Sequence, residues 1–166
     1  MNFRFVIKTV GIALCVAAVC MLPSLLISLY TRDGMAGAFL AAMAVGLLSG
    51  GALSLRRTAG DDRMQLRDGF AAVAGCWVCL SLLCALPYWL GGALPNFFDA
   101  LCESVSGLTT TGASVVNEIE ALPKSILFWR SFTQFLGGMG VLVLMLALLP
   151  RLGAGSAYLM RAESPG

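Results

Sequence analysis

A run of hydroxyl groups and glycines, GLTTTGAS (residues 107–114), interrupts an otherwise apolar region of the chain. β-Branched threonines favour extended backbone, and glycine tolerates backbone angles that other residues avoid. An extended segment of this composition directs carbonyl and hydroxyl oxygens along one line. Oxygens arranged in this way replace the water shell of a small monovalent cation. An ordinary polar turn in an outer loop is the alternative. A phosphate-binding loop is disfavoured because the Lys-Ser/Thr ending is absent.

A second candidate for chemistry is the Cys-x-x-Cys pattern of Cys76 and Cys79, which places two thiols on one face of a helix. At ~1.5 Å per residue the pair lies about 10 to 15 Å inside its apolar stretch, where a thiolate forms poorly. Packing as small hydrophobes is therefore the favoured interpretation. A four-helix membrane thiol oxidoreductase is the rival function, although it normally needs a second cysteine pair in an outer loop, where only Cys102 stands.

The composition indicates an integral membrane protein. Of the 166 residues, 58% are hydrophobic and 12% are charged, and the mean hydropathy is +0.86. A soluble domain carries about twice that charged fraction. The net charge of +2 is small and dispersed, so lipid is the expected environment and nucleic acid is not an expected partner.

Four charge-free stretches are long enough to cross a bilayer as helices: residues 9–30, 34–55, 69–90 and 131–150. The apolar run of the first stretch is longer than that of a signal peptide, and no small-x-small cleavage site follows it, so we expect a retained helix. Glycines within the stretches, at Gly46, Gly50 and 137–140, favour close helix packing, with a hinge or pore-lining role as the alternative.

The distribution of basic residues predicts that both termini are cytoplasmic. With the N-terminus inside, the inner segments carry eight Lys and Arg residues and the outer segments carry Arg32, Lys124 and Arg130. Aromatic residues at the outer ends, Tyr30, Tyr88, Trp89 and Trp129, are expected interfacial anchors. The charged inner segment 56–68 is the expected boundary between a helical hairpin (residues 1–60) and the following unit, with residues 61–68 as the linker proper.

The region between the third and fourth stretches is expected to dip into the membrane and return. Asn96 is a candidate helix N-cap, and Asp99 complements the dipole of a short helix over residues 99–108. Ten residues span ~15 Å, half of the hydrocarbon thickness. Glu118 and Glu120 then follow on the return, where carboxylates raise the local cation concentration. Lys124 and Arg130 are expected mainly to extend to the membrane interface, and the alternative for Arg130 is pairing with Glu118, Glu120 or Glu103, which would brace the loop.

Three segments of the chain resemble the Trk/Ktr potassium-uptake family, in its TrkH/TrkG-like branch: DALCESVSGLTTTGAS, LPKSILFWRSFTQFLGGMGVLVLMLALLP and YLMRAESPG. The turn Tyr30-Thr31-Arg32-Asp33-Gly34 and its flanking stretches are also similar to the family's N-terminal hairpin. The similarity covers essentially the whole chain. It implies an all-α membrane protein with four transmembrane helices plus a re-entrant pore helix and filter loop.

The resemblance also implies a function, a site and partners. The function is potassium uptake across the bacterial inner membrane, with K⁺ as substrate, no covalently bound cofactor and no enzymatic reaction. The filter contribution falls on Thr110, Thr111 and Gly112 within a helix/pore-loop/helix repeat over residues 69–150. Family members act with a cytoplasmic nucleotide-binding regulatory subunit (TrkA-like) and pair as homodimers.

Two features depart from the family's pattern. Gly112 is followed by Ala113, whereas ordinary potassium channels have Gly-Tyr-Gly, so stringent selection of K⁺ over Na⁺ is left open. Family members carry four pore repeats in one chain, whereas this sequence holds one. We therefore expect either an N-terminal portion of a longer product, with residues 151–166 as a truncated cytoplasmic tail, or an assembly of four or more copies; the first is favoured.

Overall fold

Helices form all the regular structure of the part of the chain that the computed structural model describes, residues 3–55, 66–116 and 118–148. The all-α expectation is confirmed for these residues. Of the expected linker, 61–68, residues 61–65 lie outside them and residues 66–68 belong to α4, and the expected tail at 151–166 also lies outside them. The elements are α1 (Phe3–Cys20), α2 (Leu22–Thr31), α3 (Ala36–Ser54), α4 (Leu66–Leu90), α5 (Phe97–Leu108), the short 3₁₀ helix η1 (Ile119–Ala121) and α6 (Lys124–Leu148).

Three stretches of helix within the described residues are long and apolar enough to cross a membrane: Phe3–Thr31, Ala36–Ser54 and Asp68–Leu90. They coincide with the first three expected spans. The fourth expected span, 131–150, falls largely within α6, but this helix begins earlier, at Lys124. The difference arises because the charge-free run marks only the residues that can lie in hydrocarbon. The helix itself also includes the residues before that run, among them Lys124 and Arg130.

The first span is not one continuous helix. It breaks at Met21 into α1 and α2, and Pro23 lies in the first turn of α2. Proline has no backbone N–H to donate and its ring clashes with the carbonyl four residues earlier, so it ends or bends a helix that precedes it. The expected helix over residues 9–30 therefore comprises two segments with an interruption between them.

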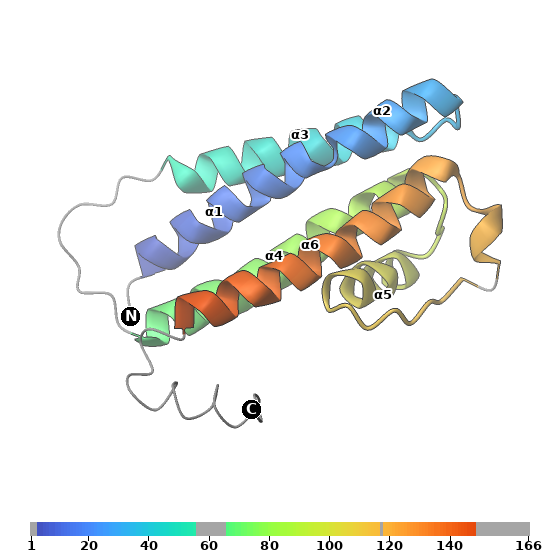
Figure 1. The fold of residues 1–166 in the computed structure, drawn as a ribbon. Coiled ribbons are helices and arrows are strands. Elements are labelled where there is room, and N and C mark those ends of the chain that lie inside the picture. Colours follow the sequence, from blue (N-terminus) through green and yellow to red (C-terminus); the bar gives the residue numbers. More distant parts are fainter. Residues whose placement is uncertain (1–2, 56–65, 117, 149–166) are drawn as a thin grey trace, which may run out of the picture.

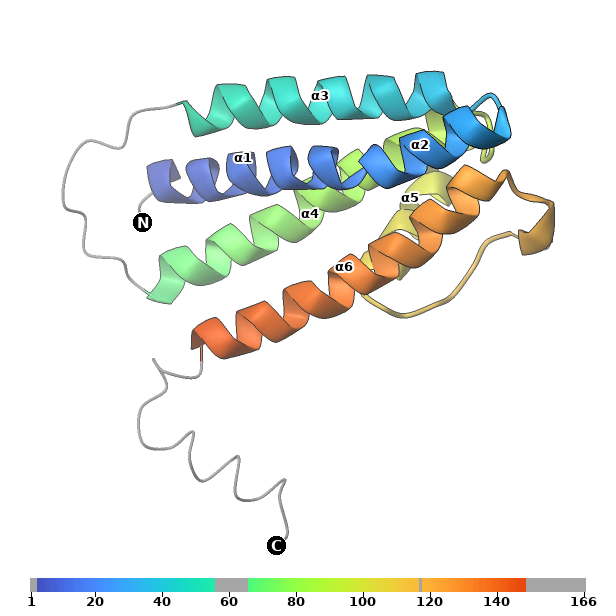
Figure 2. The same ribbon diagram turned by 45° about the horizontal axis from the view of Figure 1, so that its top comes forward.

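The helices form two layers (Figure 1, Figure 2). The α1/α2 segment and α3 make an antiparallel hairpin that lies along the α4/α6 pair, and α5 is packed beside one half of that pair. We call the end of the molecule with the α2–α3 turn, η1 and the start of α6 the loop end. The beginnings of α1 and α4 and the end of α3 lie at the opposite end.

Small residues allow α1 and α3 to approach closely. A Cβ atom added to Gly11 would lie 2.7 Å from the carbonyl oxygen of Gly50, and one added to Gly50 would lie 2.6 Å from that of Gly11. A Cβ atom at Gly46 would lie 2.9 Å from side-chain atoms of Ala18 and Leu83. The expected packing role of Gly46 and Gly50 is confirmed.

Near the loop end, large side chains join the two layers. Trp129 and Tyr88 are fully buried, and the Trp129 ring meets that of Phe39 edge to face at 6.2 Å between centroids. The indole N–H of Trp129 donates to the carbonyl of Cys84 at 3.2 Å. Expecting Tyr88 and Trp129 to anchor the protein at the interface was therefore wrong, because both lie in the core, whereas Tyr30 is 92% exposed.

Asp33 ties the α2–α3 turn to the start of α6. Its carboxylate accepts hydrogen bonds from the Ser28 hydroxyl and the Met35 N–H, and from both the N–H and the hydroxyl of Ser125. The Ser125 N–H is one of the first in α6 and has no partner within the helix. Partial burial raises the pKa of Asp33, but hydrogen bonds from Ser125, Ser28 and Met35 outweigh it, so the pKa falls from 3.8 to about 2.

Replacing Asp33 by alanine should destabilise the docking of the hairpin. Hydrogen bonds to charged groups each contribute about 1.5–3 kcal/mol, so we expect a lower thermal unfolding midpoint in detergent micelles at neutral pH. Because the folded-state pKa lies below the ordinary value, this contribution is present above about pH 4 and disappears as the pH falls through about 2. The gap between parent and Asp33→Ala should therefore close over that range.

The exposed carboxylate of Glu118, the residue before η1 at the loop end, provides the control for this prediction. Glu118→Gln should leave the unfolding midpoint of the parent nearly unchanged at neutral pH. A gap between parent and Asp33→Ala that was the same at pH 7 and at pH 2 would show that the hydrogen-bonded carboxylate is not what joins the hairpin to α6.

Candidate functional site

The expected short helix is present as α5. It begins at Phe97, where Asn96 has extended backbone and its side-chain oxygen accepts from the N–H of Phe98 at 3.1 Å. This is an N-cap interaction, and Asp99 adds negative charge in the first turn. The helix ends at Leu108, as expected, and begins two residues before the expected start because the cap fixes the boundary at Asn96.

The C-terminal end of α5 lies against the middle of α6. A Cβ atom added to Gly137 would lie 1.9 Å from the carbonyl oxygen of Leu108, so only glycine permits this approach. Gly137 stands thirteen residues after Lys124 and eleven before Leu148, about 20 Å along the helix from its start. On the other side, the Ser104 hydroxyl donates to the carbonyl of Ser81 in α4 at 2.8 Å. Helix α5 therefore ends halfway along its two neighbours.

The chain reverses direction immediately after α5. The N–H groups of Thr110 and Thr111 donate to the carbonyls of Gly107 and Ser106, both at 3.0 Å. These two bonds form a Schellman motif, in which the residue with left-handed backbone is usually glycine. Here it is Thr110, with φ +58°. A β-branched residue in this region is strained, and such strain is concentrated at functional sites.

The returning segment, residues 109–116, runs back toward the loop end alongside α6. A Cβ atom added to Gly138 would lie 3.8 Å from Thr110 Cγ2, and one added to Gly112 would lie 3.7 Å from Gln134 Nε2. Both are ordinary contact distances. Thr110 thus lies at the level of Gly138, and Gly112 at the level of Gln134. The segment therefore follows α6 from Gly138 back toward the start of that helix, and its backbone is not uniformly extended, because both Thr110 and Gly112 have positive φ.

One buried carboxylate fixes the far end of this segment. Glu103 of α5 is 1% exposed, and it accepts hydrogen bonds from the Ser114 hydroxyl at 3.1 Å and the Val115 N–H at 3.2 Å. It also forms an ion pair with Arg130 of α6. Of the three carboxylates considered as partners for Arg130, the structure therefore selects Glu103, whereas Glu118 and Glu120 are exposed.

The hydrogen bonds around the turn leave several consecutive carbonyls unbonded. The Ser106 hydroxyl donates to the carbonyl of Ala113 at 2.5 Å. Within the described part of the chain, no group donates to the carbonyl oxygens of Thr110, Thr111 or Gly112. The expected site residues are thus brought together on one exposed turn, and their carbonyls are free to bind a ligand.

The threonine hydroxyls differ in what they can bind. The Thr109 hydroxyl donates to the Val105 carbonyl at 2.8 Å and lies 2.8 Å from the Thr111 hydroxyl. Because the single Thr109 proton is already donated, Thr111 is the donor of that pair and its lone pairs stay available. The methyl group of Thr110 lies on the α6 side. Thr111 is therefore the better hydroxyl ligand, whereas Thr110 offers its carbonyl.

Sequence reasoning missed two contributors to this site. Ser106 holds the Ala113 carbonyl, and Gln134 lies beside Gly112. Glu103 was considered only as one of three partners for Arg130. All three are polar residues within otherwise apolar helices, and that pattern is the signal that would have found them.

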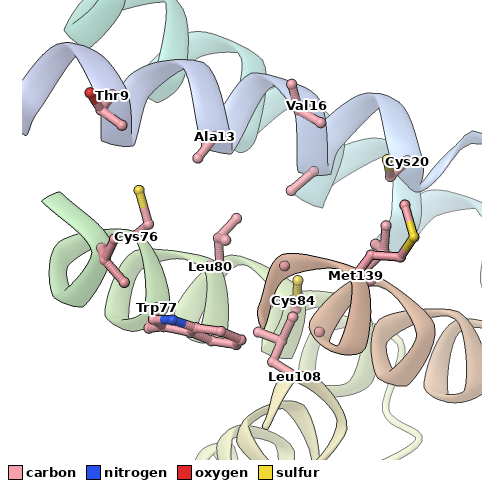
Figure 3. A pocket seen from close by; sticks show the side chains of 15 residues that line it. Thr9, Ala13, Val16, Cys20, Cys76, Trp77, Leu80, Cys84, Leu108 and Met139 are labelled. Atoms are coloured by element: carbon pink, nitrogen blue, oxygen red, sulfur yellow. The ribbon is translucent and has the colours of Figure 1, made fainter. Parts of the chain in front are cut away.

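The cysteine pair lies elsewhere. Cys76 lines an apolar cavity of about 550 Å³ between α1, α4 and α6, together with Cys20 and Cys84 (Figure 3). Cys79 does not line this cavity and is instead half-buried against the core. All the described cysteines are free thiols. Apolar surroundings disfavour the thiolate that redox exchange requires.

Comparisons with known proteins identify relatives along the whole chain. A family model for TrkH, a cation transport protein, matches residues 36–166. The Trk system potassium uptake protein TrkH of Halomonas elongata is 41% identical over 167 aligned residues, covering 100% of this chain and 35% of that protein. The corresponding protein TrkG of Escherichia coli is 35% identical, covering 99% of this chain and 34% of that protein.

A solved structure agrees with these relatives. The crystal structure of the potassium transporter TrkH from Vibrio parahaemolyticus superposes with a TM-score of 0.84 at 38% sequence identity, covering 98% of this chain and 36% of that one. The chain thus spans about a third of the length of the relatives it matches.

Substitution of Gly137 should dislodge α5. Its Cβ atom would meet backbone atoms of Leu108 that cannot move aside without shifting the helix end, and overpacking of this kind typically costs about 1–3 kcal/mol. Gly140→Ala is the matched control because the same helix leaves open space there. We expect Gly137→Ala to lower the thermal unfolding midpoint and to increase protease cleavage within residues 109–116, and Gly140→Ala to do neither.

Neutralising the buried carboxylate should release the returning segment. Glu103→Gln leaves Arg130 without its partner, and breaking a buried pair costs about 3–5 kcal/mol. Hydrogen exchange at the amide of Val115, which now donates to Glu103, should accelerate strongly. Glu120→Gln, at an exposed carboxylate, should leave that exchange rate unchanged. Equal protection of Val115 in parent and Glu103→Gln would refute the role assigned to this carboxylate.

Proposed function

The chain belongs to the TrkH family of cation transport proteins, and on that premise we propose that it contributes a filter segment, the returning segment 109–116, to a potassium uptake pathway across the inner membrane. The observation that carries the proposal is the docking of α5, which ends halfway along α6 against Gly137 and is followed by a non-helical return. A half-length helix with a non-helical return is how backbone oxygens are presented at the centre of a membrane.

The proposed ligands are the carbonyl oxygens of Thr110, Thr111 and Gly112 and the hydroxyl of Thr111. Together they provide neutral oxygens, which suit a dehydrated K⁺ ion. The C-terminal end of α5 points toward the same turn, and the partial negative charge at a helix C-terminus favours a cation there. Potassium binding thus requires no charged side chain and no covalent step, and we propose a transporter subunit without catalytic activity.

We propose the following membrane arrangement. Helix α6 is a fourth span, residues 1–60 form a transmembrane hairpin, and residues 69–150 form the helix/pore-loop/helix unit, joined by a cytoplasmic linker. The loop end faces outward, which is consistent with the excess of Lys and Arg in the opposite segments. Glu118 and Glu120, exposed near η1, would then concentrate cations at the outer mouth.

A single segment does not surround an ion. Residues 109–115 are exposed along one side, so the proposal requires further segments of the same kind to complete the ring, from additional repeats or additional copies. A homodimer of complete transporters and a cytoplasmic nucleotide-binding regulatory subunit are proposed as partners on the family's pattern. The thiol oxidoreductase alternative receives no support, because the relatives are potassium uptake proteins.

The proposal predicts that a carboxylate at Gly112 blocks transport. Gly112→Asp places a charge among the carbonyls and a side chain at φ +75°, and the backbone strain alone amounts to roughly 1–2 kcal/mol, or about tenfold in an equilibrium. The complete coding frame would be expressed in cells that lack potassium uptake. We expect at least about tenfold lower K⁺ flux and no growth at low potassium.

The matched control is Gly92→Asp, because Gly92 also has positive φ, at +72°, and open space around it. It lies in the connection between α4 and α5, away from the filter segment. This variant should keep most of its flux at equal protein level in the membrane. If Gly112→Asp transported potassium as well as Gly92→Asp, the filter assignment would be abandoned.

A further inference from the structure

The side chain of Gln134 is the polar group of α6 that lies beside the centre of the filter segment. A Cβ atom placed on Gly112 would lie 3.7 Å from Gln134 Nε2, and the Gln134 side chain is exposed. Neighbouring hydroxyls on α6 bind their own helix: Ser131 donates to the Leu127 carbonyl and Thr133 to that of Arg130. Within the described residues, the amide of Gln134 has no such bond.

The depth of Gln134 points to a role in the pathway. It stands ten residues after Lys124, about 15 Å along the helix and one turn before Gly137, against which α5 ends. Polar side chains at that depth face other protein groups or a watery cavity and mark ion pathways. Its amide lies beside Gly112, and Thr110 lies one turn further along α6, beside Gly138.

Gly112 is the least constrained joint of the filter segment. On one side the Schellman motif holds Thr110 and Thr111, and on the other Ser106 and Glu103 hold residues 113–115. The N–H of Gly112 itself reaches the Ser106 carbonyl only at 3.5 Å, beyond the usual hydrogen-bond range. Glycine also has unusual freedom to rotate its peptide planes. Because these hydrogen bonds do not fix the Gly112 peptide, a neighbouring side chain is needed to set the direction of its carbonyl.

We propose that Gln134 is a positioning residue for the filter: its amide, which makes no hydrogen bond within the described residues, is placed to bind a peptide group of Gly112 and so to set the direction of the carbonyl and the discrimination among alkali cations. The inference rests on the proposed function and deepens it. An amide suits this role because it both donates and accepts, so it can hold either group of the peptide. It also brings no charge, and so does not trap the passing ion.

The test compares selectivity with transport capacity. Gln134→Leu and Gln134→Met keep the size of the side chain and remove the amide, and Ser131→Ala, one turn away on the same helix, is the matched control. The complete coding frame is reconstituted in liposomes, and the fluxes of K⁺, Rb⁺ and Na⁺ are measured. Losing one positioning hydrogen bond should reduce the K⁺/Na⁺ flux ratio by up to about tenfold, while maximal K⁺ flux stays within about twofold.

The outcomes separate this inference from the function on which it rests. An unchanged K⁺/Na⁺ ratio in both Gln134 variants, with Gly112→Asp inactive, overturns the positioning role and leaves the filter in place. Full activity of Gly112→Asp overturns the filter itself. Parallel loss of all three fluxes in both Gln134 variants, at normal protein level, indicates a merely structural residue and also overturns the inference. A reduced ratio with Ser131→Ala unaffected supports it.

Discussion

The candidate site depends on one buried carboxylate. Glu103 belongs to α5, yet its oxygens hold the returning segment through Ser114 and Val115 and hold α6 through Arg130. Three pieces of chain are thereby fixed around one charge. A buried charge is costly unless it is both paired and hydrogen-bonded, and Glu103 has both kinds of partner. Because leaving Glu103 or Arg130 without a partner would be costly, the structure strongly favours this one arrangement of α5, α6 and the returning segment.

Helix α6 organises the rest of the molecule along its length. Its first turn receives the hairpin through Asp33 and Ser125, and its second turn receives Glu103 through Arg130. At its middle, Gly137 admits the end of α5. Polar contacts thus lie near the loop end, whereas close backbone packing lies deeper. That division suits a membrane environment, where buried polar groups need partners and small residues let helices approach closely.

The turn after α5 contains both hydrogen-bonded backbone groups, which hold its shape, and carbonyl oxygens without a hydrogen-bond donor. The hydrogen bonds that stabilise it use the N–H groups of Thr110 and Thr111 and the carbonyls of Gly107, Ser106 and Ala113. The carbonyls between these fixed points are left for a ligand. Binding groups held in place beforehand lose less entropy when an ion arrives, which is the advantage of building the site on two packed helices. The strain at Thr110 is part of the same arrangement.

The sequence by itself determined the membrane class, three of the spans, the short helix with its Asn96 cap and the segment that carries the candidate ligands. These follow from local hydropathy, spacing and capping chemistry, which act between near neighbours. Only the tertiary structure decided which carboxylate pairs with Arg130, that Asp33 caps a helix 92 residues away, and that Trp129 is buried. Such contacts join residues far apart in the chain, and hydropathy carries no information about which of several equivalent partners will meet.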